Sequence, residues 1–125
     1  GGSDTGEEDS YKAWTRQHPA IDMDEAKDVI SDDGEEVYNI YADRGIDRML
    51  ILGVHTNMCV LHRTFGIKAM VRWGVRVALI RDLTDTMYNP ARSPYVTHAA
   101  GTDLVVNFIE KFWCPTVDSA QILRA

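Results

Sequence analysis

Two short apolar runs, each of strand length and each followed by a segment with a different pattern, limit what this chain can fold into. The runs cover residues 49–52 and 75–80. A short, nearly continuous apolar run is typical of a strand that is covered on both faces of a parallel sheet. We therefore expect two buried strands in the middle of the chain.

Segments with helical spacing flank both runs. In residues 34–44, Val37, Ile40 and Tyr41 recur at spacings of three and four, and Gly45 follows as a left-handed stop. Similar spacing predicts helices over residues 58–73 and 101–113. The remaining segments are predicted as an irregular loop at 81–94 and a short strand at 115–117.

The alternation of helices and strands predicts an α/β chain with a Rossmann-like three-layer α/β/α architecture and a parallel sheet. Three strands are few for such a sheet, and the outermost strands expose unpaired backbone groups. We therefore expect that the first strands of the domain are lacking from this chain. Residues 1–20 are predicted as an acidic loop or tail, and residues 21–125 as the folded domain.

Composition narrows the possible functions. The chain has 125 residues, of which 45% are hydrophobic and 26% charged, as in an ordinary globular domain. No apolar run approaches the roughly 20 residues of a membrane helix. The net charge is −6, so neither a membrane nor a nucleic-acid partner is expected. Two cysteines are too few for a disulfide scaffold and fit a reducing compartment such as the cytoplasm.

Cys59 is the strongest candidate for chemistry. The pattern of the first strand breaks at residues 53–57, and the next helix begins near Cys59. Ligands bind at the carboxyl ends of strands in open α/β sheets. A thiol at a helix amino terminus is favoured as thiolate, and the amides of that turn form an oxyanion site. A buried structural cysteine is the alternative, because free cysteines are often buried.

Several motifs resemble the isochorismatase-like cysteine hydrolase superfamily, which includes the nicotinamidases. They are the run Gly-Val-His-Thr-Asn-Met-Cys-Val at 53–60 and the Gly-x-x-V strand that starts at Gly74 and ends near Asp82. Residues 79–90, His98, 101–104 and 114–116 look like a bacterial branch of that superfamily. The resemblance covers nearly the whole chain, most strongly 34–118, and corresponds to the carboxyl-terminal portion of the family's domain.

The resemblance implies hydrolysis of a C–N (amide-type) or related bond in a small molecule. Cys59 matches the family's nucleophile, which forms a thioester-type intermediate that water resolves. The family often has a cis peptide at the position of Val54–His55, which would aim the amides of His55 and Cys59 at the oxyanion. Lys27 lies 32 residues before Cys59 and is similar in position to the family's lysine, although a solvated surface lysine is the favoured interpretation.

One family element has no counterpart, because no residue of this chain matches the aspartate that acts as general base. The resemblance still leads us to expect an enzyme. Because the base has no counterpart, the alternative is a truncated or non-catalytic fragment that acts only by association. The expected partners are a small-molecule substrate and further copies of the chain in a homo-oligomer.

Loop positions suggest further candidates, each with a structural alternative. Thr56, Asn57, Asp82 and Tyr88 are predicted to bind substrate, although Asp82 would serve equally as a structural cap. The spacing of His55, Cys59 and His62 suggests zinc, but structural zinc needs four ligands and usually two short spacings, so no metal or cofactor is expected. A Cys–His dyad with His55, His62 or His98 is the less favoured alternative to a hydrogen-bonded histidine.

Overall fold

The computed structural model describes residues 16–124, and its contacts divide the chain into two units, residues 1–30 and 31–125. The described part of the first unit, residues 16–30, contains turns and no helix or strand. One of these turns is closed by an ion pair of 2.7 Å between Lys27 Nζ and Asp24 Oδ2. Most of the expected acidic tail at 1–20 falls outside the described residues.

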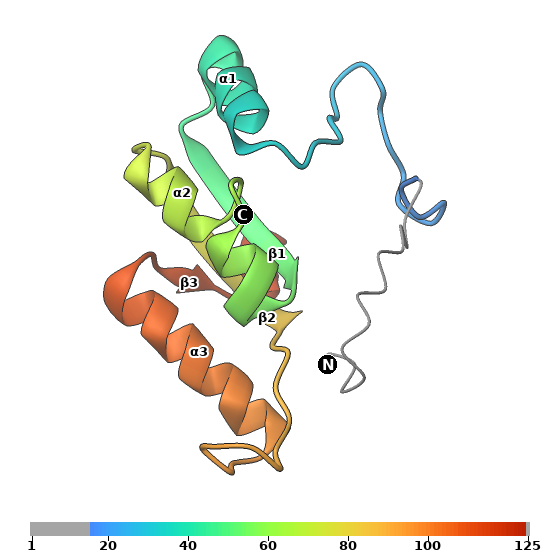
Figure 1. The fold of residues 1–125 in the computed structure, drawn as a ribbon. Helices are drawn as coiled ribbons and strands as arrows, with labels where there is room; N and C mark the ends of the chain where they lie inside the picture. The colour runs from blue at the N-terminus through green and yellow to red at the C-terminus, as the bar shows by residue number, and fades with distance from the viewer. Residues whose placement is uncertain (1–15, 125) are drawn as a thin grey trace, which may run out of the picture. The chain divides into compact units, whose positions relative to one another are not determined.

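The second unit is built on a parallel sheet with the strand order β1-β2-β3 (Figure 1). The expected α/β class with parallel strands is confirmed. The strands are Arg48–Val54 (β1), Arg76–Asp85 (β2) and Thr116–Val117 (β3). The helices are Gly34–Arg44 (α1), a π-helix Thr56–Val60 (η1), Ile67–Arg72 (α2), His98–Phe112 (α3) and Ser119–Ile122 (α4).

Helix α1 begins and ends where its sequence predicts. The Asp33 side chain caps the amino terminus by accepting hydrogen bonds from the amides of Glu35 and Glu36. Gly45 ends the helix with φ of +64°, a left-handed conformation that glycine adopts without a steric cost. Residues next to the two ends of this helix therefore mark where it begins and ends.

One face of the sheet carries the hydrophobic core. In Figure 1, α2 and α3 lie on the near side of the sheet, and the short α4 contacts β2 from the far side. The core combines β1 and β2 residues that point to the near side with residues of η1, α2 and α3. Its most buried members include Leu79, Ile67, Met70, Val106 and Ile109.

Strand β1 is not covered on both faces, which corrects the expectation drawn from its apolar run. Ile51 is buried, but the alternating residues Leu50, Leu52 and Val54 are 52%, 53% and 60% exposed. Side chains alternate between the faces of a strand, so these three share the far face. There α4 covers β2 but leaves β1 open, and β1 is also an edge of the sheet.

The expected continuous helix over 58–73 is wrong, because bends at residues 63–66 interrupt it. Gly66 packs so tightly that a Cβ atom there would lie 2.8 Å from the Val60 carbonyl oxygen. In the same interruption, the Thr64 hydroxyl accepts a hydrogen bond of 3.1 Å from the Gly34 amide at the start of α1. The break thus brings α1 against the segment between η1 and α2.

Strand β2 continues to Asp85, into the segment expected to be an irregular loop from residue 81. The register pairs Ile51 with Leu79 but Gly53 with Thr84, so two residues of β1 are matched by five of β2. This bulge lets β2 rejoin β1 beyond the core. Sequence patterns also missed α4, and α3 begins at His98 rather than near Gly101, because Thr97 supplies its amino-terminal cap.

Candidate active site

The carboxyl end of β1 leads into a compact turn at residues 53–60, here called the cysteine turn. Gly53 has φ of +109°, which side-chain-bearing residues rarely adopt, and the peptide bond between Val54 and His55 is cis. The His55 carbonyl accepts from the amides of Met58 (3.0 Å) and Val60 (3.2 Å), which closes the π-helical turn η1. Single π-helical turns are frequent at functional sites.

Cys59 lies partly exposed on this turn and borders a cavity of about 440 Å³. The cavity is open to solvent and lined by Asn57, Met58, Cys59, His62 and Arg63. All five residues come from η1 and the residues that follow it, and the Arg63 amide donates to the Cys59 carbonyl (3.2 Å). The cavity beside Cys59 thus combines the thioether of Met58 with the cationic side chain of Arg63.

Two threonines attach the cysteine turn to β2 below it. The Thr84 hydroxyl donates to the Gly53 carbonyl (2.8 Å), and its oxygen lies 2.6 Å from the Thr56 hydroxyl oxygen. Because the Thr84 proton is committed to Gly53, Thr56 must donate to Thr84. Thr56 is completely buried. Its predicted role in substrate binding therefore has a simpler alternative, in which it fixes the turn from inside.

Asn57 connects the cysteine turn to the segment after β2 through two hydrogen bonds. Its side-chain amide donates to the Met87 carbonyl (3.1 Å), and its carbonyl oxygen accepts from the Met87 amide (3.0 Å). The Asn57 side chain thus pairs with both the N–H and the C=O of Met87, as the backbone of an adjacent strand would. The position of Asn57, two residues before Cys59, thus depends on where Met87 is held.

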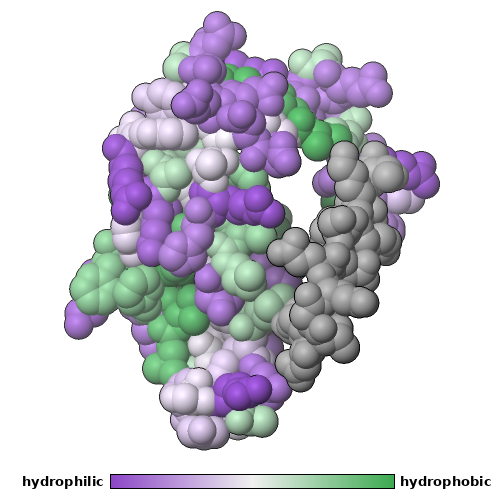
Figure 2. Space-filling model, in the orientation of Figure 1, coloured by the Kyte–Doolittle hydropathy of each residue, from purple (hydrophilic) through white to green (hydrophobic). Residues whose placement is uncertain are grey.

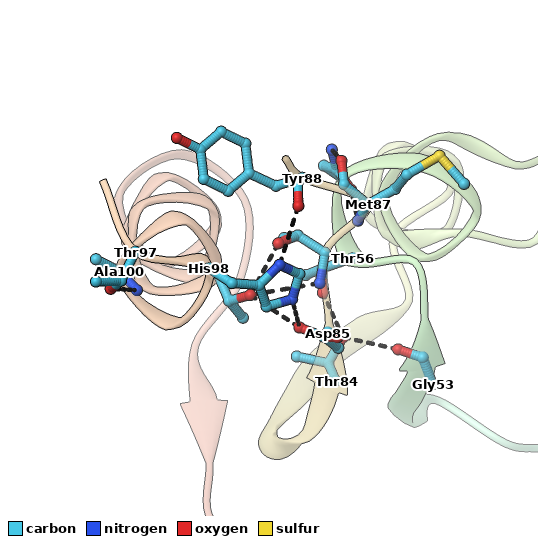
Figure 3. Close-up of polar contacts among 12 residues, drawn as sticks. Gly53, Thr56, Thr84, Asp85, Met87, Tyr88, Thr97, His98 and Ala100 are labelled. Carbon is cyan, nitrogen blue, oxygen red and sulfur yellow. Dashed lines mark hydrogen bonds and ion pairs between the residues drawn. The ribbon is translucent and has the colours of Figure 1, made fainter. Parts of the chain in front are cut away.

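A polar cluster at the start of α3 holds that segment (Figure 3). His98 Nε2 lies 2.8 Å from Asp85 Oδ1, and His98 Nδ1 lies 3.0 Å from the Tyr88 carbonyl oxygen. The Thr102 hydroxyl donates to the same Asp85 oxygen (3.0 Å) and lies 2.8 Å from the Thr86 hydroxyl. Figure 3 shows the His98 ring between Asp85 and the Tyr88 carbonyl.

The two ionisable members of this cluster shift each other's proton affinity. The hydrogen bond from His98, with that from Thr102, lowers the pKa of Asp85 below its ordinary value. The hydrogen bond to Asp85 and the one to the Tyr88 carbonyl raise the pKa of His98. Both shifts favour the charged pair.

Sequence reasoning considered His98 but gave no role to Asp85 or Thr102. The one available signal was the spacing of His98 and Thr102, which places both on the same face of α3. Their partner Asp85 follows a bulge that no sequence pattern indicated. The cluster therefore depends on pairing between distant segments.

The structure places the other predicted residues in structural settings. Asp82 accepts hydrogen bonds from the amide and hydroxyl of Ser119 at the start of α4, as expected of the cap alternative, and these bonds lower the pKa of Asp82. The Tyr88 hydroxyl contacts the backbone of Arg92 and Val96 within its own loop. Lys27 belongs to the first unit, where it pairs with Asp24, and its catalytic role stays a prediction.

The second cysteine differs from the first. Cys114 is buried, and burial raises the pKa of its thiol to about 11. Neither cysteine forms a disulfide. Among residues 16–124, no three histidine, cysteine or acidic side chains are grouped closely enough to hold a metal ion. No helix in this part of the chain is long and apolar enough to cross a membrane.

The fold is similar to that of a known protein, although no family model and no curated protein sequence matches the chain. The similar structure is the crystal structure of a cysteine hydrolase from Pseudomonas syringae pv. phaseolicola 1448A, with a TM-score of 0.59 and 19% sequence identity. The match covers 71% of this chain but only 41% of that one. At this identity the likeness establishes the α/β fold, and this chain corresponds to less than half of the hydrolase it resembles.

Proposed function

We propose that this chain is a cysteine hydrolase of the isochorismatase-like type that cleaves a C–N or related bond in a small molecule, with Cys59 as nucleophile. The observation that carries the proposal is the setting of the Cys59 thiol. It lies at the carboxyl end of a parallel strand, on a π-helical turn, beside an open cavity. The fold likeness to a cysteine hydrolase supports the same chemistry.

In the proposed reaction, the Cys59 thiolate attacks the carbonyl carbon of an amide. The developing oxyanion is stabilised by backbone amides of the turn, those of His55 and Cys59. The C–N bond breaks, the nitrogen leaves after taking up a proton from solvent, and a thioester remains on Cys59. Water then adds to the thioester and releases the acid and the thiol.

The remaining assignments follow from position. Asn57 and Arg63 at the cavity are placed to bind polar or anionic groups of the substrate. Asp82 and Tyr88 are proposed as more distant contributors to the substrate loops. Two free thiols suit a reducing compartment such as the cytoplasm.

Alkylation by iodoacetamide tests the nucleophile, with Cys114 as an internal control. Raising a thiol pKa from 9.0 to about 11 reduces its thiolate fraction at neutral pH by about 100-fold. We therefore expect partly exposed Cys59 to be alkylated faster than buried Cys114 at pH 7, and Cys59→Ser to abolish the fast labelling. Equal, slow labelling of both thiols would contradict the proposal.

Exposed apolar surface favours a second candidate function, association with a further copy of the chain. Leu50, Leu52 and Val54 form one open row on the edge strand β1. Leu104, Phe108 and Phe112 form another on α3, where Figure 2 shows hydrophobic residues gathered at the lower left. A two-fold dimer uses the same surface on both copies, so an apolar row can pack against the same row of a second copy.

Light scattering during size-exclusion chromatography tests the association. We expect a dimer that Leu52→Lys dissociates, because a charge on the edge strand opposes pairing. The control is Arg48→Lys, which keeps a positive charge on the same strand. A monomer at all concentrations would remove this candidate and leave the hydrolase proposal unaffected.

A further inference from the structure

The geometry around His98 determines how many protons it carries. Its Nδ1 faces the Tyr88 carbonyl oxygen at 3.0 Å, and its Nε2 faces Asp85 Oδ1 at 2.8 Å. A carbonyl oxygen and an ionised carboxylate can only accept hydrogen bonds. A neutral imidazole has one N–H, so it would satisfy one acceptor and turn a lone pair toward the other. Both hydrogen bonds form together only when His98 is an imidazolium.

Each of these two hydrogen bonds holds one end of a short segment, residues 85–88. Asp85 is the last residue of β2, and Tyr88 lies three residues later. Between them, Thr86 is buried and its hydroxyl lies 2.8 Å from that of Thr102 on α3. His98 therefore ties the whole segment to the first turn of α3.

The same segment carries the backbone groups that hold the cysteine turn. The amide and carbonyl of Met87 form the two hydrogen bonds with the Asn57 side chain. Asn57 and Cys59 belong to the same π-helical turn, η1, and both line the cavity. A continuous series of contacts thus runs from His98 through the 85–88 segment to Asn57.

We propose that protonated His98 is a positioning residue for Cys59, acting as a pH-dependent clamp that holds the 85–88 segment and, through Asn57, the cysteine turn. The part that concerns catalysis rests on the proposed hydrolase function. When His98 loses its proton, one of its two acceptors loses its donor. The segment then loosens at one end, and Met87 no longer fixes Asn57 in one place.

The titratable surroundings of His98 are few in the described part of the chain. Asp85 faces it from β2, and the Tyr88 ring of the loop stacks near it, with centroids 6.5 Å apart. Its own helix contributes the neutral hydroxyl of Thr102 to the same carboxylate. Asp85 is thus the charged group in contact with His98. Its hydrogen bond and negative charge raise the pKa of His98, so that His98 keeps its proton to a higher pH than an ordinary histidine.

Nuclear magnetic resonance on the full chain tests the clamp without requiring catalysis. Between pH 5 and pH 9, we expect the Asn57 side-chain amide and the Met87 backbone amide to shift with one midpoint. That midpoint should equal the His98 imidazole midpoint and lie above about 6.5. In Asp85→Asn, which removes the negative charge and keeps the size, all three midpoints should move down together. If His98 titrates while the Asn57 and Met87 signals stay constant, the clamp is refuted.

Alkylation rates test whether the clamp reaches Cys59. In His98→Gln, which is neutral at every pH, we expect alkylation of Cys59 at pH 6 to slow by about two- to thirtyfold, the usual range for a mutation that acts through a contact network. The wild-type rate should show an additional inflection at the His98 midpoint, absent from His98→Gln. His18→Gln, which removes a histidine of the first unit, should behave as wild type. If Cys59 is alkylated selectively and at the same rate in wild type and His98→Gln, the clamp is refuted and the hydrolase proposal stands.

Discussion

The pair of threonines below the cysteine turn allows a prediction of both the size and the order of mutational effects. The Thr56 hydroxyl donates to Thr84, and the Thr84 hydroxyl donates to the Gly53 carbonyl. Replacing either threonine by valine keeps the shape of the side chain and removes one hydroxyl. The two variants differ in what they leave behind.

Thr56→Val removes one hydrogen bond and leaves the Thr84–Gly53 bond intact, so we expect the free energy of unfolding to fall by about 1 kcal/mol. Thr84→Val strands two groups, the completely buried Thr56 hydroxyl and the Gly53 carbonyl. The unpaired buried hydroxyl costs about 1–3 kcal/mol and the lost bond to the carbonyl of partly exposed Gly53 about 1 kcal/mol, so we expect a loss of about 3 kcal/mol.

The double variant separates this arrangement from two independent contacts. With both hydroxyls removed, only the Gly53 carbonyl lacks its donor, so we expect a loss of about 2 kcal/mol, less than for Thr84→Val alone. The difference from the sum of the single variants is about 2 kcal/mol, within the range found for residues in one network.

Urea unfolding of the wild type, both single variants and the double variant measures these energies. Thr84→Ser is the control, because it keeps the hydroxyl and both hydrogen bonds. Single effects that add to within about 0.5 kcal/mol in the double variant would show that the two hydroxyls do not form a chain, and the deduced direction of donation would be wrong.

Three further predictions concern the core, the cysteine turn and the α4 cap. Ile109→Ala, at a completely buried position, should lower the free energy of unfolding in urea by about 2–5 kcal/mol. Gly66→Ala places a Cβ 2.8 Å from a main-chain oxygen of the cysteine turn; it should cost about 1–3 kcal/mol and slow Cys59 alkylation, and an unchanged rate would contradict this. The hydrogen bonds from Ser119 lower the pKa of Asp82 in the folded protein. They therefore stabilise the fold fully at pH values above the ordinary pKa of an aspartate, about 3.9. This stabilisation is lost as the pH falls through the lowered pKa. Ser119→Ala should therefore flatten the dependence of Tm on pH between 2 and 5, and an identical slope would argue against the cap.

Sequence patterns predicted those parts of the fold that depend on local signals. Helix α1 follows from the spacing of its apolar residues and from Gly45, and the core half of β2 follows from its apolar run. The break at Gly66 escaped prediction because it depends on contact with the Val60 carbonyl, not on glycine alone. The open face of β1 escaped it because an apolar run does not tell which neighbours cover it.

The candidate site divides in the same way. The position of Cys59 follows from the order of strand, turn and helix, which neighbouring residues establish. The attachment of Asn57 to Met87 and of Asp85 to His98 joins segments that are 30 and 13 residues apart. Such contacts depend on strand register, which a single sequence specifies only weakly where a bulge interrupts it.

The bulge divides β2 into two parts that pair with β1 in different registers. Before the bulge, Leu79 belongs to the core, and beyond it Thr84 supports the cysteine turn. The residues between them include Asp82, which accepts hydrogen bonds from Ser119 at the start of α4. An insertion or deletion in the bulged segment between Leu79 and Thr84 would not move Thr84 relative to Gly53. The distance between the core and the Cys59 thiol therefore does not depend on the length of the intervening segment, because a change in that length moves α4 instead.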